Sequence, residues 1–321
     1  MASIYKVAKT AEVSPATVSR VFSRKARVSE SVARRVRTVA EKLNYAPRVT
    51  ARKDNIALIV EGAEGIRLDN YETQLIEAVC RNLIAQKYRF EIIPADEIDL
   101  LFDLFIKGAV CILYREKSLE MARQIQRVPL VMVNCPVENF HSVYSDHCQG
   151  IELGMNHLAE RGHRRIGLIL GSLSGWGGQE RLKGYWASVK RLGLENDERL
   201  VHSRFARNLF EAVAGVVKAA PTALIVGGED AALPVMSALH LLGKKVPEDV
   251  SIVSFESTVI SQYLTPMHTT ISQPFEEIGA LSVKTIIDLA EHQPRRPVRI
   301  AVPNVLIERE SVKSIGNSKF M

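Results

Sequence analysis

The sequence predicts an α/β protein in two parts, an all-helical head within the first 47 residues and a much larger body of parallel sheets arranged in two lobes. Three observations lead to this prediction. The positive charge of the chain is concentrated in its first 53 residues. The same segment carries apolar residues at helical spacing in three short stretches. After residue 56, short apolar runs alternate with helical segments.

The charge of the chain is unevenly distributed. The first 53 residues hold 13 Lys and Arg against three Glu, a net charge of +10, whereas the whole 321-residue chain has a net charge of +6. The remaining 268 residues are mildly acidic, with 29 basic and 33 acidic groups. A basic block beside such a body is typical of a polyanion-binding module. A basic face that only meets solvent is the alternative that charge alone leaves open.

Three helices are predicted between Ser3 and Tyr45, each from its own start signal. Ser3 precedes IYKVAKTA, in which apolar residues recur at helical spacing. Ser14 suits the N-cap of the second helix, and Pro15 suits its first position, where a missing N–H loses no hydrogen bond. Ser29 begins the third helix. Its apolar stripe consists of Val32, Val36, Val39, Ala40 and Leu43.

The first two helices are separated only by residues 11–13, which is the spacing of a helix-turn-helix. In such a unit the second helix enters the major groove of DNA with its N-terminal residues at the base edges. With Val18 and Val21 facing inward, the side chains left outside are Pro15, Ala16, Thr17, Ser19, Arg20 and Ser23. A guanidinium such as that of Arg20 can contact guanine O6 and N7 together. A three-helix bundle that binds protein is the alternative.

Short apolar runs in the body predict strands at 56–60, 89–94, 108–114, 129–134, 165–171, 222–228 and 250–256. Helical segments between them include YETQLIEAVCRNLIAQ, SLEMARQIQR, CQGIELGMNHLAERG, QERLKGYWASVKRLG and LPVMSALHLLG. Continuous apolar strands that alternate with helices indicate parallel sheets covered on both faces. Ligands of open sheets bind beyond the carboxyl ends of the strands, so a site is expected in the loops after these runs.

The composition is that of a globular protein, with 46% hydrophobic and 24% charged residues. The start MASIYKVAKTAEV is not a signal peptide, and no apolar run approaches the roughly 18 residues of a membrane span. A cytoplasmic protein without a membrane partner is therefore expected. The cysteines lack C-x-x-C spacing, which favours buried thiols in a reducing compartment over metal ligands or disulfides. They are Cys80, Cys111, Cys135 and Cys148.

Catalytic motifs are missing where they would be expected. GSLSGWGG follows an apolar run and precedes a helical segment, but it contains neither G-K-[ST] nor G-x-G-x-x-G, nor the serine of G-x-S-x-G. His157 and His163 do not form the H-E-x-x-H of a zinc hydrolase. The sequence thus predicts a protein that is not an enzyme and has no metal and no cofactor. A sugar-binding or sugar-processing protein whose basic head does not read an operator is the alternative.

The segment TAEVSPATVSRVFSRKARVSESVARRVRTVAEKLNYAP resembles the DNA-binding head of the lactose and galactose repressor (LacI/GalR) family. Like that family, it has T-V-S-R-V at 17–21, V-S at 28–29 and L-x-Y-x-P at 43–47. The resemblance implies phosphate contacts by Tyr5, Thr17, Ser19 and Tyr45 and base contacts by Pro15, Ala16 and Arg20, to which the basic residues Arg27, Arg48 and Arg52 are added.

The head and linker depart from this family in the turn, in the linker and at Ser23, which stands where Asn is usual. Glu12 stands in the turn where the family usually has Gly, at a position that tends to need positive φ, at a cost on the order of 1 kcal/mol. In the family, a hinge helix after L-x-Y-x-P inserts an apolar Leu into the minor groove. Here the linker comprises only residues 48–55, and Asp54 stands at the position of that Leu. Because phosphates repel a carboxylate, we expect a basic tether and weak DNA bending.

HLAERGHRRIGLILG, QERLKGYWASVKRLGL, PTALIVGGEDAAL and LLGKKVPEDVSIVSFE are similar, in this order, to the family's effector domain, which has the type I periplasmic-binding-protein fold. The resemblance implies a head at 1–47, a linker at 48–55, an effector-binding and dimerisation domain at 56–313 and a tail at 314–321. In that domain, lobe 1 would comprise about 56–148 and 274–299, and lobe 2 about 149–273 and 300–313.

The resemblance also implies a small molecule between the lobes, most often a sugar or a nucleobase. Arg181 corresponds to an arginine of the family's cleft, and its planar fork suits vicinal hydroxyls or a carboxylate. His147 replaces the Asn that usually follows the aspartate at Asp146. The predicted effector contacts are Tyr71, Asp146, Trp176, Arg181, Glu229, Asp230 and Glu256. Each acid could instead be a helix cap or a surface charge.

Together these features predict a homodimeric transcriptional regulator, usually a repressor in families of this kind. It would bind double-stranded operator DNA and respond to a sugar-like effector. The tail SVKSIGNSKFM has no heptad pattern, so a tetramer built on a C-terminal coiled coil is not expected.

Overall fold

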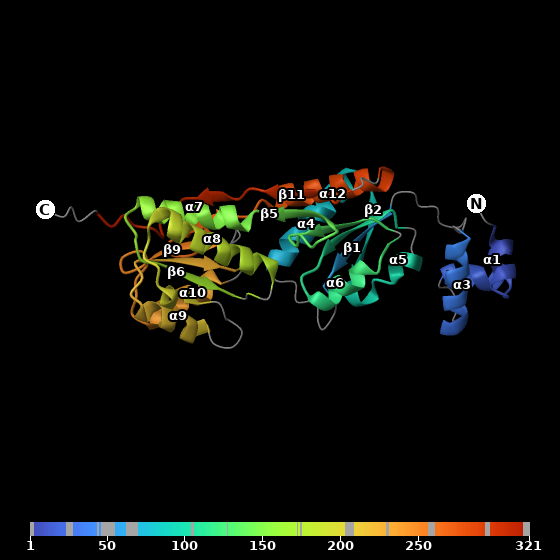
Figure 1. Cartoon of the computed structure of the whole chain (residues 1–321), viewed down its shortest axis with the longest axis horizontal. Coiled ribbons are helices and arrows are strands. Elements are labelled where there is room, and N and C mark those ends of the chain that lie inside the picture. The colour runs from blue at the N-terminus through green and yellow to red at the C-terminus, as the bar shows by residue number, and fades with distance from the viewer. Residues whose placement is uncertain are drawn as a thin grey trace. The chain divides into compact units, whose positions relative to one another are not determined.

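The computed structural model describes residues 3–23, 28–43, 45, 55–61, 70–103, 106–126, 128–171, 173, 175–202, 209–228, 231–255, 261–292 and 296–316 (Figure 1). The chain divides into two compact units. The first unit consists of Met1–Gly65, Leu83–Val131 and Lys284–Pro294, and the second unit of Ile66–Asn82, Met132–Val283 and Arg295–Met321.

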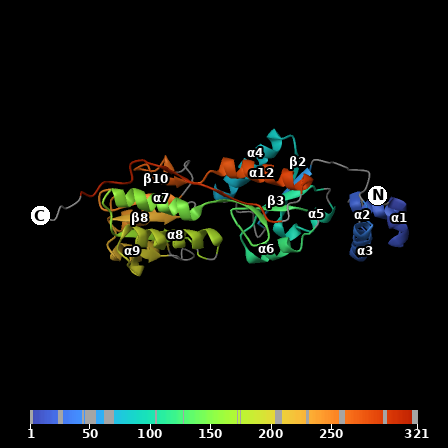
Figure 2. The same cartoon turned by 45° about the horizontal axis from the view of Figure 1, so that its top comes forward.

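The described part of the head contains three helices, α1 (Ile4–Thr10), α2 (Pro15–Ser23) and α3 (Glu30–Lys42) (Figure 2). Each begins after its predicted serine. The hydroxyl of Ser3 accepts the backbone N–H of Lys6 at 3.3 Å, and that of Ser14 accepts the N–H of Thr17 at 3.0 Å. Ser29 is the N-cap of α3, but its hydroxyl lies 3.4 Å from that of Ser31 and makes no capping hydrogen bond to the backbone. The head core consists of Val7, Ala8, Ala11, Val18, Val21, Ala33, Val36, Ala40 and Tyr45.

The first sheet has six strands in the order β11-β5-β4-β3-β1-β2. They are β1 (Asn55–Val60), β2 (Arg89–Pro94), β3 (Gly108–Ile112), β4 (Leu130–Val133), β5 (His141–Ser145) and β11 (Arg299–Val302). β1 pairs in parallel with β2 and β3, and all its residues are buried, as a strand covered on both faces requires. The helices that alternate with these strands are α4 (Asn70–Ala85), α5 (Leu100–Asp103), α6 (Glu116–Arg123) and α12 (Phe275–Glu291), with a 3-10 turn at Ala95–Glu97.

The second sheet has six strands in the order β12-β10-β9-β8-β6-β7. They are β6 (Ile166–Leu170), β7 (Val201–His202), β8 (Ala223–Gly227), β9 (Ser251–Phe255), β10 (Thr269–Ser272) and β12 (Val305–Ile307). β12 pairs antiparallel with β10, and the other pairings are parallel. The helices are α7 (His147–Glu160), α8 (Trp176–Leu192), α9 (Leu209–Lys218) and α10 (Ala232–Leu241), with a 3-10 turn at Glu198–Leu200.

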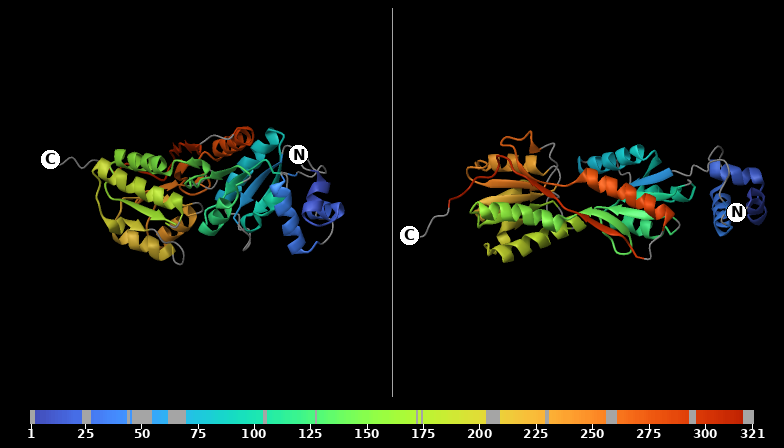
Figure 3. Two further views of the ribbon diagram at one scale, coloured as in Figure 1. Left: turned by 45° about the vertical axis from the view of Figure 1, so that its right-hand side comes forward. Right: turned by 90° about the horizontal axis from the view of Figure 1, so that it is seen from above.

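Helices cover both faces of the second sheet, α7 and α8 one face and α9 and α10 the other (Figure 1 and Figure 3). Strand β6 shows how the strand residues are shared between these layers. Leu168 and Leu170 pack with α7 and α8, whereas Ile169 packs with α9 and α10. Because successive side chains point to opposite faces, a strand covered on both sides must be apolar at every position. The continuous run RIGLILG follows from this requirement.

The predicted fold class is confirmed, and all seven predicted strands are present with ends within two residues of the prediction. The five quoted helical segments form α4, α6, α7, α8 and α10. Strands β5, β7, β10, β11 and β12 have no counterpart in the prediction. In β5 and β10 the sequences HSVYS and TTIS mix polar with apolar residues, so the apolar run that identified the others is absent. Strands β7, β11 and β12 have only two, four and three residues. Among the described helices, none has both the length and the apolar composition needed to cross a membrane.

Candidate functional site

The turn between α1 and α2 confirms the backbone conformation predicted at Glu12. Glu12 has a φ of +52°, in the left-handed region that glycine adopts most easily. The N–H of Val13 donates to the carbonyl of Ala8 at 3.0 Å. The N–H of Glu12 donates to the carbonyl of Lys9 at 3.4 Å, which completes a Schellman-type end to α1. The turn is therefore kept without glycine, and the strained backbone costs on the order of 1 kcal/mol.

The first turn of α2 is fixed by its cap. The Ser14 hydroxyl accepts the N–H of Thr17 and lies 2.9 Å from its hydroxyl. Val18 and Val21 are buried against the other head helices. Of the predicted DNA contacts on α2, Ala16 and Arg20 are exposed, and Pro15, Thr17 and Ser19 are half-buried. The accessible side of α2 thus combines small side chains, which allow close approach to bases, with one guanidinium.

The other predicted DNA contacts of the head differ in their surroundings. Tyr5 on α1 is 72% exposed, as a phosphate contact requires. Tyr45 is only 8% exposed, and its ring packs against Phe22 with the centroids 6.1 Å apart. The ring of Tyr45 is therefore part of the head core. Arg27, Arg48 and Arg52 lie outside the described residues.

In the second unit, His147, Trp176, Arg181 and Phe255 form a group that we call the aromatic–arginine cluster. Phe255 ends β9, while His147 and Trp176 begin α7 and α8. The ring centroid of His147 lies 5.1 Å from that of Trp176 and 5.3 Å from that of Phe255. The guanidinium carbon of Arg181 lies 4.3 Å from the Phe255 centroid, and the Tyr144 ring meets Trp176 edge-on at 5.2 Å. The cluster lies at a strand's carboxyl end, where open sheets bind ligands.

His147 is the buried polar member of this cluster. Burial, and secondarily the charge of Arg181, holds the pKa of His147 well below its ordinary value, so the imidazole is neutral at physiological pH. Its Nδ1 is buried and has no hydrogen-bond partner within the described parts of the chain. Since buried polar groups are nearly always hydrogen-bonded, this nitrogen is available to a bound molecule or water.

Two glycines let helices approach these rings. A Cβ on Gly177 would lie 2.9 Å from Nε2 of His147, and a Cβ on Gly150 would lie 2.6 Å from a ring carbon of Phe255. Such contacts are too short for a close-packed interior, so a larger residue would displace the rings. The packing of α7 and α8 around the cluster therefore depends on both positions.

Asp146 and Tyr71 have structural partners of their own. The carboxylate of Asp146 accepts the N–H of Gln149 at 3.0 Å and caps α7, which is the helix-cap role that the sequence left open. The hydroxyl of Tyr71 accepts a hydrogen bond from Asn134 Nδ2 at 2.7 Å. Its ring packs edge-on against Phe275, with the centroids 5.7 Å apart. Contacts of Asp146 and Tyr71 with an effector stay predictions.

Among the predicted effector contacts, Trp176 and Arg181 meet in one cluster. Glu229, Asp230 and Glu256 lie outside the described residues. The predicted set lacks His147 and Phe255, although both carried a signal. Phe255 is an aromatic residue at the end of an apolar strand, and His147 directly follows the predicted Asp146. The cluster offers two ring systems, one fixed cation and one neutral imidazole, a combination suited to a polar ring-shaped ligand.

Two family models match the chain. The model of the bacterial regulatory proteins of the lacI family matches residues 3–48, which include the three head helices. The model of the periplasmic binding protein-like domain matches residues 155–312, which include most of the second sheet and its helices.

Known proteins are similar over nearly the whole chain. The HTH-type transcriptional repressor PurR of Escherichia coli is 28% identical over 335 aligned residues, covering 97% of each protein. The solved complex of the transcriptional regulator CelR with cellobiose is 25% identical, with a TM-score of 0.73, and the match covers 97% of this chain and 100% of that one. The lac repressor dimer bound to operator and the anti-inducer ONPF is 23% identical, with a TM-score of 0.70 and coverages of 97% and 99%. The lac repressor match supports the fold alone.

Proposed function

The chain belongs to the LacI family of bacterial regulatory proteins, and on this basis we propose that it is a repressor that binds operator DNA through its head under the control of a sugar-like effector. This family consists of transcriptional regulators and not of enzymes. The observation that carries the DNA-binding part is the geometry of α2, a capped helix with Ala16 and Arg20 exposed after a turn of helix-turn-helix form.

Selection of bound DNA from a random library by the full-length protein tests operator binding. We expect two similar half-sites about a twofold axis, because a homodimer presents two identical recognition helices. Affinity should fall steeply with salt, with a log–log slope of roughly −0.9 for each phosphate neutralised. Sedimentation should show a dimer. Bound sequences without a shared motif would contradict operator reading, and a monomer on DNA would contradict the homodimer.

The aromatic–arginine cluster is the proposed effector site, together with Tyr71, Asp146, Glu229, Asp230 and Glu256. Aromatic rings can stack on the C–H face of a sugar, and the Arg181 fork can donate two parallel hydrogen bonds to neighbouring hydroxyls. The neutral ring of His147 can hydrogen-bond a hydroxyl without adding a charge. A related regulator was solved with cellobiose, which supports a carbohydrate class.

Calorimetry with a panel of monosaccharides and disaccharides tests the effector site. Arg181→Ala is expected to weaken sugar binding about tenfold or more, since a hydrogen bond to a charged group contributes about 1.5–3 kcal/mol. Arg191→Ala is the matched control, because Arg191 lies on the same helix and donates to Asn156 at 2.8 Å. Unchanged affinity in Arg181→Ala would remove the cluster from the site. Binding of a purine base but of no sugar would contradict the effector class.

We also propose the division into a head at 1–47, a linker at 48–55, a two-lobed effector domain at 56–313 and a tail at 314–321. The linker lies almost wholly outside the described residues. With Asp54 at the position of the family's apolar wedge, operator bending should be weak. Energy transfer between dyes at the two ends of a short operator measures the bend. We expect a larger bend with Asp54→Leu than with the unchanged protein, and a strong bend in the unchanged protein would contradict the proposal.

A further inference from the structure

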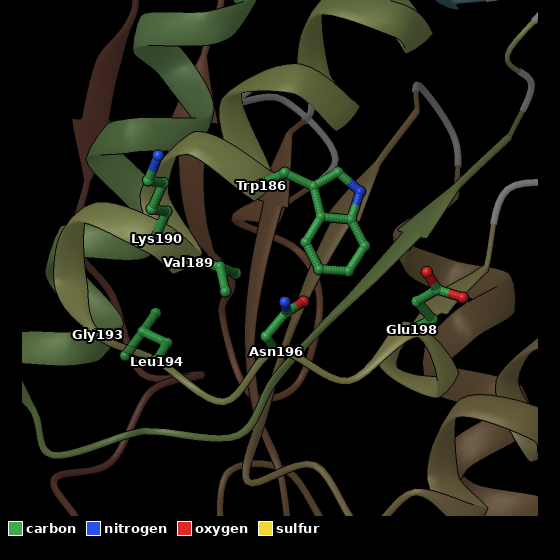
Figure 4. Close-up of a pocket in the computed structure, with 7 residues that line it drawn as sticks. All are labelled: Trp186, Val189, Lys190, Gly193, Leu194, Asn196 and Glu198. Carbon is green, nitrogen blue, oxygen red and sulfur yellow. The ribbon is translucent and has the colours of Figure 1, made fainter.

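A pocket lies at the C-terminal end of α8, the helix that begins at Trp176. Figure 4 shows the residues that line it. Its volume is about 470 Å³, within the range that small ligands occupy. Helix α8 contributes Trp186, Val189 and Lys190, and the segment after it contributes Leu194, Asn196 and Glu198. At about 1.5 Å per residue, Trp186 lies roughly 15 Å along the helix from Trp176, so this pocket is separate from the aromatic–arginine cluster.

The apolar floor of the pocket is set by the way α8 ends. Gly193 takes a φ of +60°, and the N–H of Leu194 donates to the carbonyl of Val189 at 3.0 Å. This Schellman-type end brings the side chains of Leu194 and Val189 together beneath the opening. The indole of Trp186 packs edge-on against the buried ring of Tyr185, with the centroids 4.9 Å apart, which fixes its orientation.

The segment after α8 alternates between two environments. Glu195 and Asp197 form ion pairs with Arg165, the second with an N–O distance of 3.2 Å. Asn196, which lies between these two residues, lines the pocket instead, as does Glu198 at the start of the 3-10 turn. The ion pairs thus anchor the chain on both sides of Asn196.

Three polar side chains of the pocket have no partner of their own. Within the described ranges, Lys190, Asn196 and Glu198 make no side-chain hydrogen bond or ion pair, unlike Glu195 and Asp197 between them. Lys190 and Glu198 also cancel in charge. The two opposite charges give the pocket no net attraction for either an anion or a cation, and its polar side chains beside an indole suit a neutral ligand with several hydroxyls.

From these features we propose that the pocket binds a neutral sugar unit, independently of the proposed effector site. The indole of Trp186 stacks on the C–H face of the sugar ring. The amide of Asn196 donates to one hydroxyl and accepts from another. Glu198 accepts and Lys190 donates further hydrogen bonds at the rim.

The two tryptophans of the chain allow each site to be observed separately, because Trp176 lies in the aromatic–arginine cluster and Trp186 in this pocket. The full-length protein is labelled with 5-fluorotryptophan, and the two ¹⁹F resonances are assigned with Trp176→Phe and Trp186→Phe. The probes are the methyl glycosides of glucose, galactose and ribose, with glycine betaine as a zwitterion and phosphate as an anion. We expect at least one glycoside to shift the Trp186 resonance along its own saturation curve.

Variants connect this shift to the pocket. Asn196→Ala and Glu198→Gln should each lower the glycoside affinity, measured from the saturation curve of the Trp186 resonance, about fivefold. This is the effect of losing one hydrogen bond. Glu120→Gln, which changes an exposed carboxylate on α6, should leave this affinity unchanged. An unchanged Trp176 resonance in each variant shows that the second unit remains folded.

Four results would overturn the proposal. Two concern the glycosides: none of them moves the Trp186 resonance, or the shift persists undiminished in both pocket variants. In the third, only betaine or phosphate moves the Trp186 resonance. In the fourth, glycosides move the Trp176 resonance alone. The last of these would still support the effector site. A response confined to Trp186 would support the second site and count against a sugar at the cluster.

Discussion

The core of the described head consists of valine and alanine side chains around the ring of Tyr45, whereas the second sheet buries leucine and isoleucine on both faces, with phenylalanine and tyrosine on the face covered by α7 and α8. The head helices have only 7, 9 and 13 residues, and a module of this size buries little apolar surface. The DNA-reading surface is thus carried by the less stabilised region, and the aromatic–arginine cluster by the more stabilised one. Substitutions in the two regions should therefore have separable effects.

The largest expected effect comes from the core of the second sheet. Leu168→Ala should lower the free energy of unfolding by about 2–5 kcal/mol, because it removes a fully buried side chain between β6 and its covering helices. Urea denaturation followed by tryptophan fluorescence measures this, since both tryptophans belong to the second unit.

The matched head variant is Val18→Ala. It should lower the free energy of unfolding of the head by about 2 kcal/mol and weaken DNA binding. The urea unfolding transition of the second unit, followed by tryptophan fluorescence, should not change. A shift of that transition by Val18→Ala would break the comparison between the two regions.

The second prediction concerns pH. Burial, and secondarily Arg309, lowers the pKa of His268 to about 4, and its Nδ1 lies 2.7 Å from the hydroxyl of Ser254. The unfolded chain, with a histidine pKa of about 6.5, binds more protons below that pH. The stability contributed by neutral His268 is therefore fully present above about pH 6.5 and is lost toward pH 4, by about 3 kcal/mol.

His268→Asn should reduce this pH dependence of the fluorescence-detected unfolding. The head has no histidine in its sequence, so hydrogen exchange of its amides, corrected for the intrinsic rate, should not show the same loss of protection. An equal pH slope with and without His268 would contradict the prediction.

The third prediction separates two arginines within the head. Arg20→Ala should cost about 1–3 kcal/mol on operators with the matching base and much less on operators altered at that base pair. Arg35→Ala, which removes an exposed side chain of α3, should weaken binding to every operator alike. Titration of a set of single-base operator variants measures both. A uniform loss with Arg20→Ala would show that Arg20 contacts only the backbone of DNA.

The smallest expected effect is at the strained turn. Glu12→Gly should stabilise the head by about 1 kcal/mol, because glycine adopts positive φ without a Cβ penalty. Lys6→Gly, inside α1, should destabilise it by a similar amount. Hydrogen exchange of the head amides in the full-length protein compares the two. The same sign for both substitutions would contradict the strain at Glu12.

Signals that act over a few residues were sufficient for much of the fold. Ser3, Ser14 and Ser29 located the starts of the head helices, because a cap needs only the next turn of chain. Continuous apolar runs located the central strands, because a strand covered on both faces has no polar side. Strands β5, β7, β10, β11 and β12, which lie at or next to an edge of their sheets, escaped prediction because none of them contains a long apolar run.

The sequence by itself determined the basic helix-turn-helix head, the parallel sheets of the body and the presence of Trp176 and Arg181 near a strand end. Only the tertiary structure decided that His147 is buried and neutral, that Arg181 stacks on Phe255, and that Trp186 lines a pocket at the far end of the same helix. The physical reason is that capping and periodicity depend on adjacent residues. Burial, ring contacts and pKa depend on groups brought together from distant parts of the chain.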